Sequence, residues 1–154
     1  YFLSVEAFEE MIEKDELLEW AKVYDNYYGT PLKKVEEKLA AGEDILLEID
    51  TQGAMKVREK FPEGVYIFIL PPSLAELERR IRGRDTETED VLQKRLAAAI
   101  DEIEAGKCYK YVVTNDEVER AVCAIESVLR AERCLVTRNG ELFDEIEKGR
   151  DDQV

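Results

Sequence analysis

The feature that most constrains the fold is an unbroken apolar run at residues 65–70, VYIFIL. A run this short and this apolar is typical of a β-strand covered on both faces, as in the middle of a parallel sheet. Strand-like segments also occur at 17–23, 45–50 and 109–114, with helical patterns at 5–12, 31–42, 52–61, 73–82, 88–105 and 116–133. Because strands alternate with helices, the sequence predicts an α/β fold built on a parallel sheet.

Local signals predict where several helices begin and end. Thr30 followed by Pro31 is a favourable helix start, with the hydroxyl as N-cap and proline in the first turn. Ser73 with Glu76 three residues later predicts a capping box, and Gly42 predicts a helix end. The predicted apolar stripe of the helix at 116–133 consists of Val118, Val122, Ile125 and Leu129. The acidic segment 139–154 is expected to be loosely ordered.

Composition restricts the possible partners of these 154 residues, which suffice for one domain. A net charge of −14 disfavours nucleic acid and anionic membranes as ligands. The sequence has no run long and apolar enough for a membrane helix and no signal peptide, so we predict a soluble, cytoplasmic protein. It lacks histidine, and its three cysteines have no metal-binding spacing, so no protein-held metal site is predicted.

Two carboxylates stand at the end of the strand-like segment 45–50, ILLEID. Residues two apart on a strand share a face, so Glu48 and Asp50 point the same way. Open α/β sheets bind ligands at the carboxyl ends of their strands, where Asp50 is expected. The residues alone leave two interpretations open: a ligand site, or carboxylates that pair with a nearby lysine or arginine.

Arginines are concentrated in the segment RRIRGR, at positions 79, 80, 82 and 84. Arginine binds phosphate through paired donors, and the adjacent Gly83 allows a close approach. The alternative is a helix end whose cations complement the helix dipole and pair with Glu76 and Glu78. That alternative explains Arg84 least well, because Arg84 falls beyond the predicted helix.

A loop with two tyrosines, NYYGTP, is predicted at residues 26–31. Its phenols and its threonine hydroxyl can hydrogen-bond a base edge or a phosphate. Taken alone, the loop is better explained as a turn in which Tyr27 packs inward and Tyr28 is half exposed.

In combination, the segments LLEWAKVYDNYYGTP, ILLEIDTQGA, FILPPS and RIRGRDTETE resemble the guanylate kinase family in order and spacing, over about residues 1–133. The resemblance implies transfer of the γ-phosphate of ATP to GMP, with Mg²⁺ on ATP. It implies guanine recognition by Glu19, Thr30 and Asp50, and contacts of Tyr28 and Gly29 with GMP. Carried over in the same way, Arg80, Arg84 and Arg95 would act on the phosphates during transfer.

The resemblance also implies a domain plan on a P-loop NTPase-like parallel sheet flanked by helices. Residues 1–31 would be part of a GMP-binding subdomain, 32–82 and 96–133 core, 83–95 a lid and 134–154 an acidic tail. None of the eight glycines opens the family's phosphate-binding loop, GxxxxGK(S/T), so that segment is expected to precede Tyr1. An alternative function is a catalytically inactive guanylate-kinase-like domain that binds phosphorylated peptides.

Overall fold

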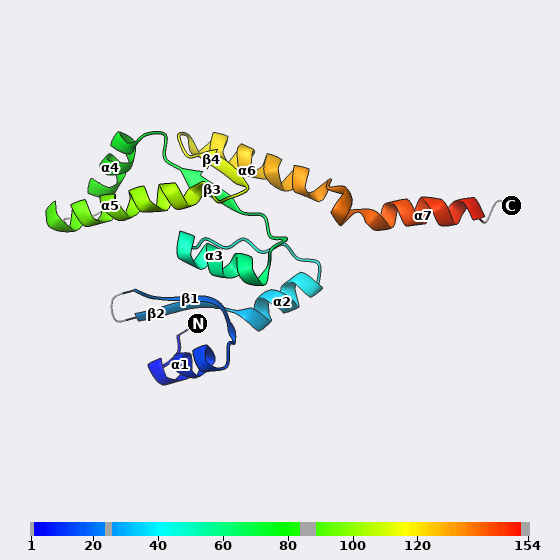
Figure 1. The fold of residues 1–154 in the computed structure, drawn as a ribbon, viewed down its shortest axis with the longest axis horizontal. Coiled ribbons are helices and arrows are strands. Elements are labelled where there is room, and N and C mark those ends of the chain that lie inside the picture. Colours follow the sequence, from blue (N-terminus) through cyan, green and yellow to red (C-terminus); the bar gives the residue numbers. More distant parts are fainter. Residues whose placement is uncertain (1, 24–25, 84–88, 152–154) are drawn as a thin grey trace. The chain divides into compact units, whose positions relative to one another are not determined.

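A computed structural model describes residues 2–23, 26–83 and 89–151 of the chain (Figure 1). They form two compact units, Tyr1–Gly64 and Val65–Val154. The first unit contains helices α1 (Val5–Glu13), α2 (Leu32–Ala40) and α3 (Thr51–Lys60), and strands β1 (Leu17–Val23) and β2 (Asn26–Pro31). The second contains β3 (Ile67–Leu70), α4 (Leu74–Arg82), α5 (Glu89–Gly106), β4 (Tyr111–Thr114), α6 (Val118–Arg133), a short 3₁₀ helix η1 (Val136–Arg138) and α7 (Gly140–Asp151).

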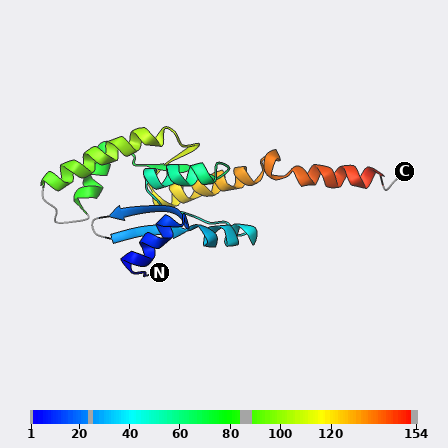
Figure 2. The same cartoon turned by 60° about the horizontal axis from the view of Figure 1, so that its bottom comes forward.

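The first unit is organised around an antiparallel hairpin of β1 and β2, which lie side by side (Figure 2). The residues predicted as a tyrosine loop therefore form strand β2, so the loop prediction was wrong. Thr30 is also not a helix cap, because Pro31 occupies the N-cap position of α2 without a side-chain hydrogen bond. Strand pairing with β1 explains both differences, since it turns Thr30 toward a residue of the neighbouring strand.

A break in register explains why three consecutive residues of β1 are buried. Leu17 pairs with Pro31 and Glu19 pairs with Thr30, so Leu18 is an extra residue with no partner of its own. Extra residues of this kind bend a strand and redirect the side chains beside them. In β1, the consequence is that Leu17, Leu18 and Glu19 are all buried, where a regular strand would alternate.

Helix α3 is attached to β1 by apolar and polar contacts. Ala54 and Val57 are buried on α3. The side chain of Lys56 donates a hydrogen bond to the carbonyl of Trp20 at 3.0 Å, and that of Lys60 donates to the carbonyl of Leu17 at 3.0 Å. These two carbonyls flank Glu19 in the sequence, so α3 holds the stretch of β1 that carries this carboxylate.

The strand predicted at 45–50 is not present as a strand among the described residues. The alternation that suggested it is preserved, because Ile45, Leu47 and Ile49 are half-buried while the residues between them are exposed. A strand also needs a hydrogen-bonded neighbour, and the sheets of the described residues comprise only β1 with β2 and β3 with β4. Leu46 is accordingly 86% exposed. The segment is extended chain that leads into α3.

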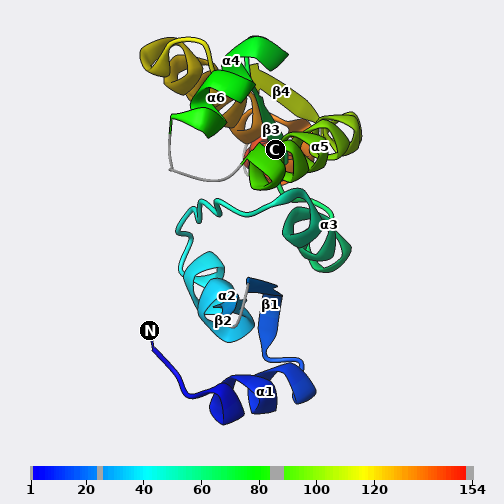
Figure 3. The same cartoon turned by 90° about the vertical axis from the view of Figure 1, so that its left-hand side faces the viewer.

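In the second unit, β3 and β4 form a parallel pair (Figure 3). Each has four residues, so both are shorter than predicted, and the apolar run at 65–70 is not covered on both faces. Val113 is buried, whereas Ile69 and Val112 are exposed. The two sheets give a mixed α/β architecture.

Two further predictions about the second unit were wrong. Helix α6 buries Ala121 and Glu132, while Val118 of the predicted stripe is 67% exposed. The pattern of large apolar residues missed this face because a small residue and a charged one occupy it. Residues 140–151 form helix α7 rather than a loose tail. Among the helices of the described residues, all are too short or too polar to cross a bilayer.

Candidate functional site

Glu19 is the central residue of the candidate site in the first unit. The register break in β1 buries it, leaving 8% of the residue exposed. The hydroxyl of Thr30, on the paired strand, donates a hydrogen bond to Glu19 Oε1 at 2.7 Å. Within the described ranges, no lysine or arginine lies at ion-pair distance from Glu19. Its second oxygen, Oε2, accepts no hydrogen bond there and still retains access to solvent.

Asp50 contributes a second carboxylate at the start of α3. It is the N-cap of this helix, and its Oδ1 accepts a hydrogen bond from the backbone N–H of Gly53 at 2.7 Å. An anionic cap is favourable because helix N-termini carry partial positive charge. In the described residues neither Asp50 nor Glu48 is paired with a basic side chain, so nothing there supports the ion-pair interpretation of this segment.

The two carboxylates converge at Gly53. A Cβ atom built on Gly53 would lie 3.2 Å from Asp50 Oδ1 and 3.4 Å from Glu19 Oε2. Glu19 comes from β1 and Asp50 from the segment before α3, so the docking of α3 on β1 brings them together. The result is a cluster of carboxylate oxygens beside a residue without a side chain.

The hairpin places Tyr28 on the same face as Glu19 and Thr30. Thr30 pairs with Glu19 and Tyr28 with Ala21, and residues two apart on a strand share a face. Tyr28 is 59% exposed. Tyr27 points to the opposite face, where its ring stacks on Phe8 with centroids 5.2 Å apart. A shallow pocket of about 390 Å³ adjoins Thr30 and is otherwise lined by Pro31, α2 and the segment 43–47.

Gly29 has a packing reason to be glycine. A Cβ atom there would lie 2.9 Å from the carbonyl oxygen of Glu19 and 3.0 Å from Phe8 Cζ. The absence of a side chain thus lets β2 approach β1 and α1 closely.

Chemically, the cluster of Glu19, Asp50 and Thr30 is rich in acceptors. Ionised carboxylates only accept hydrogen bonds, whereas a threonine hydroxyl can donate one and accept others. The single hydroxyl proton of Thr30 is directed to Glu19. Such an arrangement suits a ligand that presents adjacent N–H groups.

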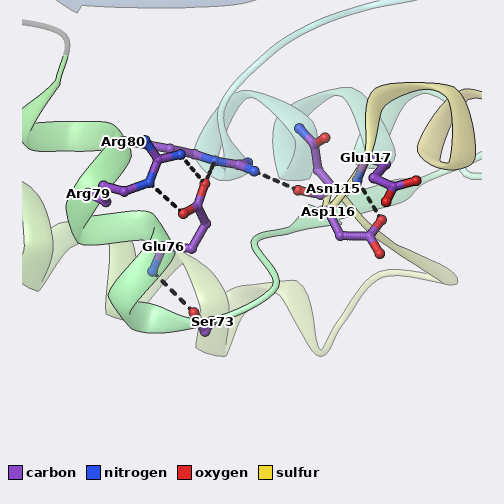
Figure 4. Close-up of polar contacts among 7 residues, drawn as sticks. All are labelled: Ser73, Glu76, Arg79, Arg80, Asn115, Asp116 and Glu117. Carbon is purple, nitrogen blue, oxygen red and sulfur yellow. Dashed lines mark hydrogen bonds and ion pairs between the residues drawn. The ribbon is translucent and has the colours of Figure 1, made fainter.

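The second candidate site is the arginine-rich end of α4. Arg79 and Arg80 both donate hydrogen bonds to Glu76 at 2.7 Å (Figure 4). These two guanidinium groups, Arg79 foremost, lower the pKa of Glu76 to about 2. Arg80 also donates to the carbonyl of Asn115, directly after β4, at 3.0 Å. Only half of the predicted capping box forms: Ser73 accepts from the Glu76 N–H, while the Glu76 side chain binds arginines.

Arg82 has two acidic partners. It lies 2.9 Å from Glu78 and 2.9 Å from Glu89 at the start of α5. Pairing with Arg82 lowers the pKa of Glu89 to about 2. The alternative interpretation, in which α4 arginines pair with Glu76 and Glu78, is therefore confirmed for Arg79, Arg80 and Arg82. Arg84 lies outside the described residues, and Arg95 is half-buried on α5.

The structure adds residues that the sequence did not single out. Gly53 lies in the first turn of α3, and Lys56 and Lys60 fix that helix to β1. A glycine inside a helix is itself a signal, because glycine is unfavourable there unless a neighbour needs the space. The lysines gave no such signal, since exposed lysines are common on helices.

Comparisons with known proteins identify the family of this chain. The sequence profile of the family described as "Guanylate kinase" matches residues 1–132. The chain is 57% identical to a guanylate kinase of Halalkalibacterium halodurans over 146 residues, which are 95% of this chain and 72% of that protein. It is 54% identical to a guanylate kinase of Caldanaerobacter subterraneus subsp. tengcongensis, of which it covers 71%.

A comparison with solved structures also finds a guanylate kinase. The crystal structure of guanylate kinase from Anaplasma phagocytophilum matches with a TM-score of 0.73 and 37% identity, covering 90% of this chain and 67% of that one. These relatives define the class as nucleoside monophosphate kinases. The chain belongs to the guanylate kinase family, so the resemblance read from its motifs is confirmed.

Proposed function

We propose that this chain binds GMP in its first unit and serves the transfer of the γ-phosphate of ATP to GMP, giving ADP and GDP. The observation that carries the proposal is the buried carboxylate of Glu19 next to Asp50, which has no basic partner in the described part of the chain. A buried carboxylate without a cation is costly unless donors satisfy it. Guanine supplies such donors as its N1–H and its exocyclic amine.

The same chemistry explains selectivity for guanine. Adenine has an acceptor at N1 and no amine at C2, so it would leave Glu19 and Asp50 facing an acceptor or nothing. Sites built on hydrogen bonds to the substrate reject an analogue that lacks them by on the order of 10⁴-fold. In this proposal, guanine binds with its donor edge toward the two carboxylates.

The Thr30 hydroxyl would donate a hydrogen bond to the O6 atom of guanine, but only after it rotates away from Glu19. One proton cannot serve both Glu19 and O6, and it is directed to Glu19 in the structure. When the guanine N–H groups bind Glu19, the carboxylate no longer needs this donor. The hydroxyl can then rotate toward O6. Tyr28 and Gly29, on the same strand, would lie near the GMP phosphate.

Arg80, Arg84 and Arg95 are proposed to stabilise the charge on the phosphates during transfer. Phosphoryl transfer depends mainly on positioning and on positive charge. Arg80 is bound to Glu76 and the Asn115 carbonyl, so it would exchange these partners for phosphate oxygens or remain in place as a nearby charge. Mg²⁺ would arrive with ATP. The described residues contain no group of three or more metal-ligating side chains, and coordination by phosphate oxygens fits that surface.

The finer architecture is also part of the proposal. We infer a P-loop NTPase-like parallel sheet as the setting, residues 1–31 as part of a GMP-binding subdomain, and 83–95 as a lid. The core would comprise 32–82 and 96–133, followed by a tail at 134–154. A cytoplasmic location fits an enzyme that uses ATP and GMP.

Isothermal titration calorimetry on the 154-residue chain tests nucleotide recognition. GMP is expected to bind at least about a hundredfold more tightly than AMP, because AMP lacks both donors. Equal affinities for GMP and AMP would contradict the assignment of Glu19 and Asp50 to guanine.

A further inference from the structure

We propose that Gly53 is a positioning residue for guanine selectivity, because its missing side chain leaves the space into which the carboxylates of Glu19 and Asp50 converge. This inference rests on the proposed function. A Cβ atom at position 53 would meet Asp50 Oδ1 at 3.2 Å and Glu19 Oε2 at 3.4 Å. The next nearest atom, Ile49 Cβ, is at an ordinary contact distance of 3.5 Å.

The backbone does not require glycine at this position. Gly53 is a regular residue of α3, and positive φ values among the described glycines occur only at Gly42. In a helix, alanine is intrinsically more favourable than glycine. Something other than helix formation must therefore explain why this buried position lacks a side chain.

Two other glycines show what a packing requirement looks like. At Gly29, a Cβ atom would collide with the Glu19 carbonyl oxygen at 2.9 Å. At Gly106, it would lie 2.8 Å from the ring of Phe68. Those obstacles are a strand backbone and a packed ring. At Gly53 the two nearest atoms are carboxylate oxygens, so an added methyl group would act first on the binding cluster.

The carboxylates cannot move away without losing other contacts. Asp50 Oδ1 is held by the Gly53 N–H at 2.7 Å, and Glu19 Oε1 by the Thr30 hydroxyl at 2.7 Å. The helix cannot withdraw easily either, because Lys56 and Lys60 bind carbonyls of β1. A methyl group at position 53 would therefore rotate one or both carboxylates out of the geometry that receives the donors of guanine.

The test is Gly53→Ala in the 154-residue chain, with Gly140→Ala as the matched control, because a Cβ atom at Gly140 meets nothing within 4 Å. Calorimetry would compare GMP with IMP, which keeps N1–H and O6 but lacks the exocyclic amine. In Gly53→Ala, GMP affinity should fall roughly tenfold to a hundredfold, the size of a misplaced charged hydrogen bond. The preference for GMP over IMP should narrow, and the control should match the wild type.

Thermal unfolding separates positioning from packing. The melting temperature of Gly53→Ala should change little, because the helix-propensity gain of alanine offsets the weakened contacts of the displaced carboxylates. A loss of stability like that expected for Gly29→Ala would overturn the proposal, because Gly53 would then serve packing.

The outcomes also distinguish a failure of the proposed guanine recognition from a failure of the proposed role of Gly53. A wild-type chain without preference for GMP over IMP would overturn the proposed guanine recognition itself. A wild-type preference that survives unchanged in Gly53→Ala would overturn only the role of Gly53 and leave the proposed function standing.

Discussion

Two glutamates are buried among the described residues, one in each unit, and they have opposite surroundings. Glu132 on α6 is 3% exposed and binds Lys110 at 2.6 Å, the hydroxyl of Tyr111, and Arg138 at 3.4 Å. Glu19 on β1 is 8% exposed and receives one hydrogen bond in the described part of the chain, from Thr30.

The difference teaches how to tell a structural carboxylate from a binding one. The ammonium group of Lys110 and then the hydroxyl of Tyr111 lower the pKa of Glu132, so its charge is compensated in the folded chain. Glu19 is buried without a basic partner among the residues that the structure describes. A group that folding leaves incompletely satisfied is one that a ligand can satisfy, which is why we propose Glu19, and not Glu132, as a binding residue.

The largest effect that follows from this comparison is on stability. Glu132→Ala should lower the free energy of unfolding by about 3 kcal/mol, because it leaves Lys110 and Tyr111 without their shared acceptor. Urea denaturation monitored by circular dichroism would measure the change. Glu126→Ala, on the exposed side of the same helix, is the matched control and should cost under about 1 kcal/mol. A Glu132→Ala variant as stable as the control would show that the cluster contributes nothing.

Glu19 should behave in the reverse way. Glu19→Gln should weaken GMP binding by roughly 1.5–3 kcal/mol, because the amide replaces an ionised acceptor. Its stability should equal or exceed that of the wild type, since the substitution removes a buried charge that no basic side chain of the described residues compensates. Calorimetry measures the affinity for GMP, and urea denaturation measures the free energy of unfolding. Glu16→Gln serves as an exposed control. If Glu19→Gln lost stability and kept its GMP affinity, the contrast between the two glutamates would be invalid.

Thr30 should have a smaller effect on the same site. Thr30→Val removes the hydroxyl and preserves the shape, so GMP affinity should fall by about 1 kcal/mol, as for one neutral hydrogen bond. Thr30→Ser keeps the hydroxyl and should restore most of the affinity in the same titration. A Thr30→Val variant with wild-type GMP affinity would contradict the role of the hydroxyl, and failure of the serine variant to bind GMP would show that the threonine methyl group is required as well.

Much of this site could be predicted because it depends on local patterns. The helix predicted at 52–61 corresponds to α3, which Asp50 caps, and the motif resemblance named Glu19 and Thr30 before their contact was known. The contact itself could not be predicted, since it requires the register break at Leu18. Nothing local in the sequence fixes how two strands are aligned.

Other features were missed because they depend on partners distant in the sequence. The segment 45–50 alternates like a strand, yet strands exist only through their neighbours, which a pattern cannot supply. Glu132 on α6 lies 22 residues after Lys110 and 21 after Tyr111 in the sequence, so no local pattern could predict the partners that let a charged residue be buried there. Long-range pairing, not local propensity, decided each of these cases.

The smallest expected effect is the response of Glu132 to pH. Its pKa is below the ordinary value in the folded protein, so between the two values the unfolded chain binds a proton that the native chain does not. Stability from Glu132 is therefore complete above about pH 5 and decreases as acid approaches the native pKa. Urea denaturation of wild type and Glu132→Gln at pH 7 and pH 3 measures this difference. Other carboxylates, including Glu76 and Glu89, titrate in both proteins, so their contributions cancel in the difference in stability between wild type and Glu132→Gln. The stability advantage of the wild type should shrink at pH 3; an unchanged advantage would mean that the charge of Glu132 does not contribute to folding.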